Sequence, residues 1–113
     1  MRIKELFAQD FIDPVFVPDS DEEITTAYTG DLLSDVLANA EAHSLLITIQ
    51  AHVNTIAVAC AALIPSVIIC NGRPIDPAMI EAAKRESIAL GSTKMSWFNF
   101  SCKIGSLLQK KIS

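Results

Sequence analysis

Apolar and polar positions follow one another along the chain in blocks that predict strands alternating with helices. Two short runs, 45–49 and 66–70, are almost continuously apolar, which is typical of strands buried on both faces of a parallel sheet. The segment between them, 54–63, is apolar all round and rich in alanine, so it predicts a buried crossover helix close to its neighbours. A strand, a helix and a parallel strand therefore follow directly.

The chain before this unit predicts a further strand and two helices. β-Branched and aromatic residues over 24–28 favour a strand, and Asp31 has the position of an N-cap for a helix over 32–40. An opening segment with apolar residues at helical spacing predicts a short amphipathic helix, and the prolines near 15–17 favour an edge strand followed by an acidic turn. The residues expected to face inward from these helices are Ile3, Leu6, Phe7, Leu32, Leu33, Val36, Leu37 and Ala40.

The chain after this unit predicts two more helices and a short strand. Asp76 followed by Pro77 is typical of a helix start, and the helix should run to about Ser87. Residues 88–90 favour a strand, and residues 91–96 a turn into a final helix with Trp97, Phe100, Ile104 and Leu108 facing inward. The sequence thus predicts one α/β domain over residues 1–113, with three layers and a mostly parallel sheet flanked by helices.

Polar segments separate the predicted strands from the helices that follow them. Carboxyl ends of parallel strands share one edge, where open α/β folds bind ligands. Free N–H groups at helix starts suit an anion, with Arg73 and Lys94 as its charged partners. His52 and Asn54 are candidates for hydrogen bonds to a base or a sugar. The candidate ligand-binding residues are Thr29, Gly30, Asp31, His52, Asn54, Asn71, Gly72, Arg73 and Thr93.

The alternative is that this edge only caps helices and turns the chain. Four of its side chains are of the types that commonly cap helices, namely Asp31, Asn54, Asp76 and Ser96. A single histidine at a helix start is also a common turn residue. Sequence alone leaves both interpretations open.

Charge and composition exclude some classes of function. A formal net charge of -4 argues against a nucleic-acid surface, which needs a basic face. No apolar run approaches the ~20 residues that a bilayer requires, so we expect a cytoplasmic protein without membrane contact. The three cysteines, Cys60, Cys70 and Cys102, lie in apolar stretches without C-x-x-C spacing, and we expect them to be buried structural thiols.

Motifs of catalysis are absent from the sequence. The letters GSTK at 91–94 do not form a phosphate loop, because their order differs and the first glycine is missing. Neither G-x-S-x-G nor H-E-x-x-H occurs, and His43 and His52 are the only histidines. Asp31 and Asp35 lie one helical turn apart, but a cap and a solvated face account for them. We expect no enzyme activity, no metal and no cofactor.

The segment 24–108 resembles a DRTGG domain, in particular the small stand-alone proteins found beside genes for iron hydrogenases and anti-sigma-type kinases. The motifs that carry the resemblance are GDLLSDVLANA, ITIQAHVNTIAVA and NGRPIDPAMIEAAKRE. The naming motif of the family is present only in pieces, at 29–31 and 71–73. The resemblance implies an α/β fold like the N-terminal domain of HPr kinase/phosphorylase, whose phosphate loop lies in a separate domain that this sequence does not contain.

The resemblance also implies a regulatory role. DRTGG domains accompany CBS domains in regulated pyrophosphatases, where the regulatory region senses adenine nucleotides, and they occur in phosphate acetyltransferases. A non-catalytic, ligand-sensing module that binds an adenine nucleotide or another small anion is the function implied, together with a homodimer. The alternative is a homodimeric interaction protein that docks a partner enzyme, for example in a hydrogenase- or kinase-linked system, and takes no small-molecule ligand.

Overall fold

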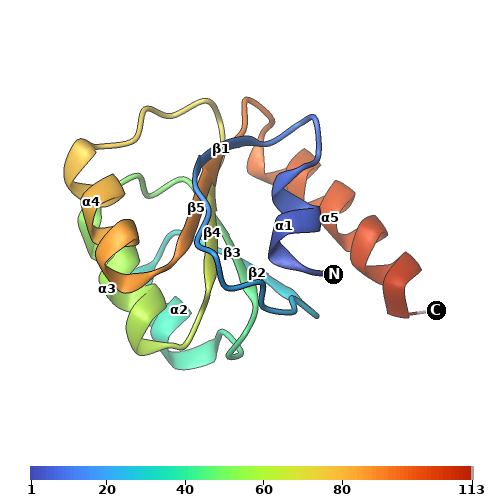
Figure 1. Ribbon diagram of the computed structural model, residues 1–113, viewed down its shortest axis with the longest axis horizontal. Helices are drawn as coiled ribbons and strands as arrows, with labels where there is room; N and C mark the ends of the chain where they lie inside the picture. Colours follow the sequence, from blue (N-terminus) through green and yellow to red (C-terminus); the bar gives the residue numbers. More distant parts are fainter. Residues whose placement is uncertain (113) are drawn as a thin grey trace.

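A five-stranded sheet lies between two layers of helices in the computed structural model, which describes residues 1–112, with side chains as far as Gln109 (Figure 1). The strand order is β1-β5-β4-β3-β2. The strands are β1 Asp13–Phe16, β2 Ala27–Thr29, β3 Leu45–Thr48, β4 Ser66–Ile69 and β5 Ala89–Ser92. The helices are α1 Ile3–Phe7, α2 Leu33–Asn39, α3 Val53–Ala61, α4 Pro77–Glu86 and α5 Trp97–Ile112. The predicted α/β class, with a mostly parallel sheet between helices, is confirmed.

Four of the five strands are parallel and lie in sequence order. β2 pairs with β3, β3 with β4 and β4 with β5, whereas β1 pairs antiparallel with β5 and forms the predicted edge strand. Every residue of β3 and β4 is buried, as their apolar runs predict. The three crossovers all step in one direction across the sheet, so α2, α3 and α4 lie on the same face (Figure 1).

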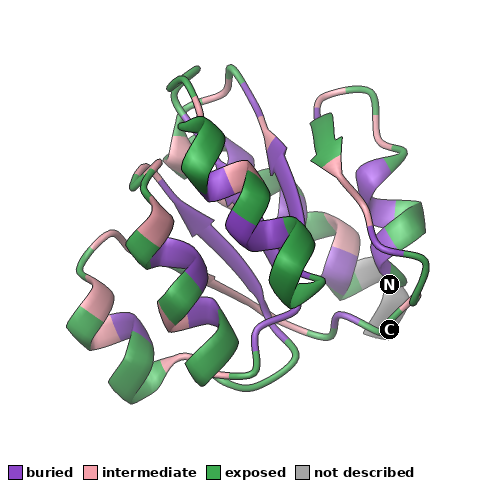
Figure 2. Cartoon of the chain, turned by 60° about the vertical axis from the view of Figure 1, so that its left-hand side comes forward, coloured by how far each residue is buried: buried purple, intermediate pink, exposed green. Residues whose placement is uncertain are grey.

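Two hydrophobic cores lie on opposite faces of this sheet. Leu46, Val67 and Leu90 pack with α2, α3 and α4, while the alternating positions such as Ile47 and Ile68 pack with α1 and α5. Figure 2 shows the result, with buried strands at the centre and exposed residues along the outer sides of the helices. Among the described residues, no helix combines the length and the apolar character needed to cross a membrane.

The start of α2 differs from the sequence prediction. The N-cap is Leu32, which has no capping side chain, because Asp31 lies one residue too early to accept from the first turn. Leu32 and Leu37 are 65% and 52% exposed, so the predicted inward stripe is wrong at both positions. Only Val36 is fully buried. Helix α2 has seven residues and lies at the β2 side of the sheet, so just one narrow side of the helix faces the sheet.

Helix α3 and the cysteines are less buried than predicted. Thr55, Ile56 and Ala59 are the buried residues of α3, whereas its outer side is exposed at Ala57 and Ala61. The helix belongs to an outer layer, and small side chains on its outer side need no covering. Of the three cysteines only Cys70 is buried, and burial raises the pKa of its thiol to about 12; Cys60 and Cys102 are exposed.

Strand β5 is longer than predicted and includes Gly91 and Ser92, which were expected to form a turn. Gly91 is buried where β5 pairs with β1 beneath α1. A Cβ atom there would lie 2.9 Å from Cε2 of Phe7, 3.0 Å from Cδ1 of Ile68 and 3.1 Å from the carbonyl oxygen of Asp13. The close approach of β1 and α1 therefore requires glycine at this position.

We expect Gly91→Ala to lower the free energy of unfolding by about 1–3 kcal/mol, because the carbonyl of Asp13 belongs to the backbone and cannot rotate away. Gly105→Ala is the matched control. No atom lies within 4 Å of a Cβ built at Gly105, and alanine is favoured over glycine inside a helix by about 0.5–1 kcal/mol. Urea unfolding measures both effects. Equal stability of the Gly91→Ala variant and the wild type would contradict the packing described.

Candidate functional site

The carboxyl ends of the four parallel strands lie at one edge of the sheet, which we call the carboxyl edge. The register aligns Thr29 with Ile47, and Thr48 with Ile69, so the segments that follow these strands start at the same level. All nine predicted ligand-binding residues end a strand or follow one at this edge: Thr29, Gly30, Asp31, His52, Asn54, Asn71, Gly72, Arg73 and Thr93. The shared edge is as predicted, and ligand binding there stays a prediction.

The topology of the sheet reverses between β4 and β5. The chain leaves β4 toward α4 on one face, whereas it leaves β5 toward α5 on the other (Figure 1). In open α/β sheets, such a point separates the two loops and opens a crevice in which ligands bind. Asn71, Gly72 and Thr93 lie at this point.

Hydrogen bonds between the two loops close this crevice. The N–H of Gly72 donates to the carbonyl of Thr93 over 3.0 Å, and the N–H of Asn71 donates to the carbonyl of Met95 over 2.8 Å. Oδ1 of Asn71 also accepts from the N–H of Trp97 at 3.1 Å. Thr93 is only 2% exposed, and its hydroxyl accepts from the N–H of Met95. Asn71, Gly72 and Thr93 thus hold the loops together.

Helix caps occupy further polar groups of the carboxyl edge. Nδ1 of His52 accepts from the N–H of Asn54 at 3.2 Å, so His52 caps α3, and the interpretation of Asn54 as the cap is wrong. Asn54 lies inside the first turn, and its own N–H is the group that the cap satisfies. As predicted, Asp76 caps α4 by accepting from the N–H of Ala78 at 3.0 Å. Ser96 likewise accepts from the first turn of α5.

The end of β2 is tied to α5 by hydroxyl groups. Oγ1 of Thr29 lies 2.7 Å from Oγ of Ser101, and the Ser101 hydroxyl donates to the carbonyl of Trp97 at 2.6 Å. Because that donation uses the only hydroxyl hydrogen of Ser101, Thr29 is the donor in the pair. The N–H of Gly30 donates to the carbonyl of Ile47 and extends the pairing with β3. Thr29 and Gly30 therefore also have structural roles.

Sequence reasoning missed a carboxylate that is bound rather than solvated. Tyr28 donates its hydroxyl hydrogen bond to Oδ2 of Asp35, and Asn39 donates to Oδ1 at 2.8 Å. These hydrogen bonds, that of Tyr28 first, hold the pKa of Asp35 below its ordinary value. The same contact raises the pKa of Tyr28. The sequence contains this tyrosine seven residues before the aspartate. One lies in a strand and the other in the following helix, and no sequence pattern predicts a contact between two such positions.

Arg73 and Lys94 are the two predicted cations of the carboxyl edge. Arg73 and Lys94 are exposed, and neither forms an ion pair or a side-chain hydrogen bond with the residues whose side chains are described. Lys94 and Thr93 line a pocket of about 280 Å³ that also contains Asp10 and Asp13, so charges of both signs meet there. The loop pairing keeps Arg73 and Lys94 in adjacent segments of one edge.

The two histidines lie at opposite edges of the sheet. His43 precedes β3 and His52 follows it, so they cannot act as an acid–base pair on one substrate. No group of three or more His, Cys, Asp or Glu residues within the described chain could hold a metal ion. No protein-family model matches this sequence, and no curated protein is significantly similar to it. A proposal about function therefore has to start from the geometry of the carboxyl edge.

We expect Asn71→Ala to lower the free energy of unfolding by about 2–3 kcal/mol. Asn71 has a φ of 65°, a conformation that alanine adopts at a cost of about 1–2 kcal/mol, and alanine also removes the acceptor for Trp97. Asn71→Asp retains the acceptor and Asn71→Gly retains the backbone freedom, so each should lose less. Urea unfolding of the three variants tests this. Equal losses in all three would contradict a role of Asn71 in joining the loops.

Proposed function

We propose that this protein is a non-catalytic regulatory module that binds a small anion, such as an adenine nucleotide, at the carboxyl edge of its sheet. The observation that carries the proposal is the pairing of the loops after β4 and β5. Gly72 and Thr93 are joined by a backbone hydrogen bond, and the residue after each is a cation, Arg73 or Lys94. Two cations without an ion pair to any described side chain thus come from adjacent loops that the fold holds in place.

Electrostatics favours a phosphate group at this position. The chain carries a net charge of -4, and neither Arg73 nor Lys94 forms an ion pair with a described side chain, although Asp10 and Asp13 line the same pocket as Lys94. The amino ends of α3, α4 and α5 lie at the same edge and add positive partial charge. The caps of these helices already use several of their N–H groups, so the charges of Arg73 and Lys94 would supply most of the binding free energy. A guanidinium and an ammonium form strong, charge-assisted hydrogen bonds to phosphate oxygens.

Recognition of the rest of a nucleotide would fall to the neighbouring loops. His52 is exposed and offers an imidazole ring beside the end of β3, and Asp31 follows β2 at the same edge. The separation of the two histidines supports a binding role rather than catalysis. The resemblance of 24–108 to DRTGG domains supports a regulatory role, since the polar residues at 30–31, 50–54 and 71–76 all belong to the motifs that carry it.

We expect adenine nucleotides to raise the melting temperature of the protein in a saturable manner, since a ligand of the folded state stabilises it by mass action. Arg73→Ala should weaken the apparent affinity about tenfold, which is the effect of losing one hydrogen bond to a charged group. Arg85→Ala, which removes an exposed arginine near the other end of α4, is the matched control. A flat response of folded wild type to every nucleotide, or equal losses in both variants, would sink the proposal.

A second function is favoured by the outer surface of α2 and α3. This α2–α3 surface comprises Leu37, Ala57, Ala61 and Leu63, all exposed, the last at 65%. Helix α3 contains no charged residue from Val53 to Ala61, and α2 packs beside it. Apolar surface of this kind marks contact sites. Because this surface contains no charged residue, two copies of it could pack together across a two-fold axis without like-charge repulsion. Such packing would suit a homodimer that docks a partner enzyme.

If this second function holds, Ala61→Arg should convert a dimer into a monomer, because a desolvated and unpaired charge costs several kcal/mol at an interface. Sedimentation velocity over a range of protein concentrations measures the change. Ser106→Arg places the same charge on the exposed side of α5 and should leave the dimer intact. A wild-type protein that sediments as a monomer at every concentration would rule out the homodimer.

A further inference from the structure

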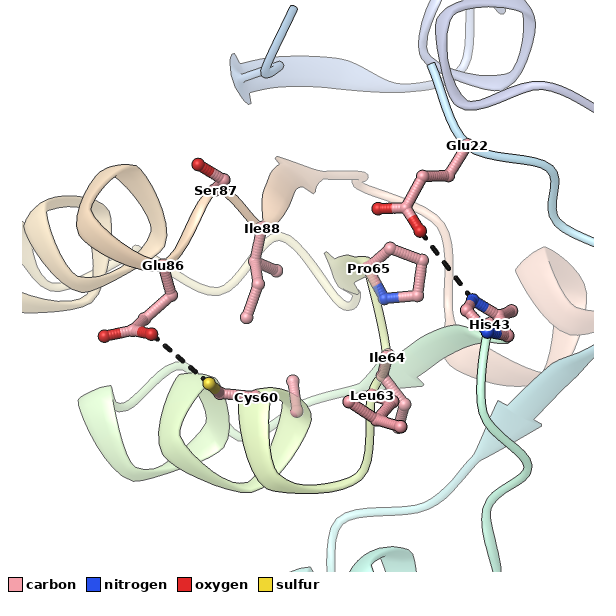
Figure 3. A pocket seen from close by; sticks show the side chains of 10 residues that line it. Glu22, His43, Cys60, Leu63, Ile64, Pro65, Glu86, Ser87 and Ile88 are labelled. Atoms are coloured by element: carbon pink, nitrogen blue, oxygen red, sulfur yellow. Dashed lines mark hydrogen bonds and ion pairs between the residues drawn. The ribbon is translucent and has the colours of Figure 1, made fainter. Parts of the chain in front are cut away.

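A second pocket lies at the other end of the sheet, the amino edge, away from the proposed anion site. It has a volume of about 230 Å³ and opens between the carboxyl ends of α3 and α4 (Figure 3). Its apolar wall is formed mainly by Leu63, Ile64, Pro65 and Ile88. None of the nine carboxyl-edge residues lines it. Nothing derived above for the anion site assigns a role to this pocket.

Two glutamates lie on opposite sides of this pocket. Figure 3 shows Glu22 beside His43 on one side and Glu86 beside Cys60 on the other, with Pro65 and Ile88 between them. Oε1 of Glu22 lies 3.7 Å from Nδ1 of His43, and Oε2 of Glu86 accepts from the Cys60 thiol at 3.2 Å. No lysine or arginine lines the pocket. The two carboxylates therefore dominate its charge.

The neighbourhood favours positive charge in two further ways. Helix α3 ends here without a basic residue in its last turn, so the negative partial charge of its carboxyl end is not compensated from within the helix, whereas Lys84 and Arg85 offset the carboxyl end of α4. Glu86 raises the pKa of the Cys60 thiol, first through their hydrogen bond, which is the effect of a nearby negative charge. The one arginine beside Glu86 is Arg85, whose Nε lies 3.8 Å away, but its side chain is 67% exposed and does not line this pocket.

We propose that this pocket binds a small organic cation, an alkylammonium or alkylguanidinium group with a short apolar chain. The chain would lie on Ile64, Pro65 and Ile88, and the charge between Glu22 and Glu86. The volume lies below the about 300–1,000 Å³ of pockets for drug-sized ligands, which favours a short chain. Carboxylates form their strongest hydrogen bonds with such charged donors, and burial of the methylene groups adds to the affinity.

The test is an NMR titration of the full chain with n-butylammonium and 1,4-diaminobutane, with n-butanol as the uncharged analogue. Both amines should cause saturable shifts at the amides of Cys60, Leu63 and Ile88, and added salt should weaken them. Glu22→Gln and Glu86→Gln should each weaken binding about fivefold, the effect expected for one partly exposed ion pair. Glu81→Gln lies on the exposed side of α4, outside the pocket, and should change the affinity less than twofold.

Three outcomes would overturn the proposal. These are n-butanol binding as tightly as n-butylammonium, saturable shifts that map elsewhere, and Glu81→Gln weakening binding as much as Glu86→Gln. A lysine blocked at both backbone ends distinguishes the source of the cation. Tighter binding of blocked lysine than of the diamine would assign the site to a lysine side chain, and weaker binding would assign it to a free amine; both results support a cation site. Failure of the nucleotide experiment would leave this test unaffected.

Discussion

Burial of β3 and β4 on both faces is the constraint on which the rest of the structure depends. Strands without an exposed residue must be covered by helices on both sides, and parallel neighbours must be joined by crossovers long enough to contain those helices. The three crossovers from β2 to β5 all step in one direction, which puts α2, α3 and α4 on one face. The other face would stay open if α5 did not return across it and pack with α1. The reversal after β5, and the meeting of two loops there, follow from that need.

The same arrangement gives the two ends of the sheet different electrostatic character. Every helix between parallel strands runs against them, so α3 and α4 begin at the carboxyl edge and end at the amino edge. Their positive ends lie beside Arg73 and Lys94, and their carboxyl ends lie beside Glu22 and Glu86. Both signs of side-chain charge occur at each edge, because Asp10 and Asp13 line the pocket of Lys94, and α4 carries Lys84 and Arg85 in its last turn. The difference between the two edges therefore comes first from the helix dipoles, to which Arg73 and Lys94 add at one edge and Glu22 and Glu86 at the other.

The parts of the fold that sequence could predict are those governed by local pattern. The runs that became β3 and β4, the Asp76 cap and the shared carboxyl edge all follow from neighbouring residues and from parallel topology. The exposure of Cys60 could not be predicted, because small side chains are tolerated both in a core and on an outer face. The hydrogen bonds that close the crevice could not be predicted from the sequence either. They depend on backbone donors of Asn71 and Gly72 meeting carbonyls more than twenty residues away, and no side-chain pattern encodes those pairs.

The closed crevice also bears on how ligand binding could regulate this protein. A ligand that needed Asn71 would have to separate the loops and remove the acceptor at the start of α5, at the expense of stability. A ligand held by Arg73 and Lys94 would break no internal hydrogen bond, and it would bind a surface that is already formed. His52 lies between these cases, since the nitrogen that caps α3 is its Nδ1, while the rest of its exposed ring is not used by that cap. Under the proposed function, the exposed part of the His52 ring could contact a ligand while its Nδ1 keeps the cap of α3, the helix whose other end lines the amino-edge pocket.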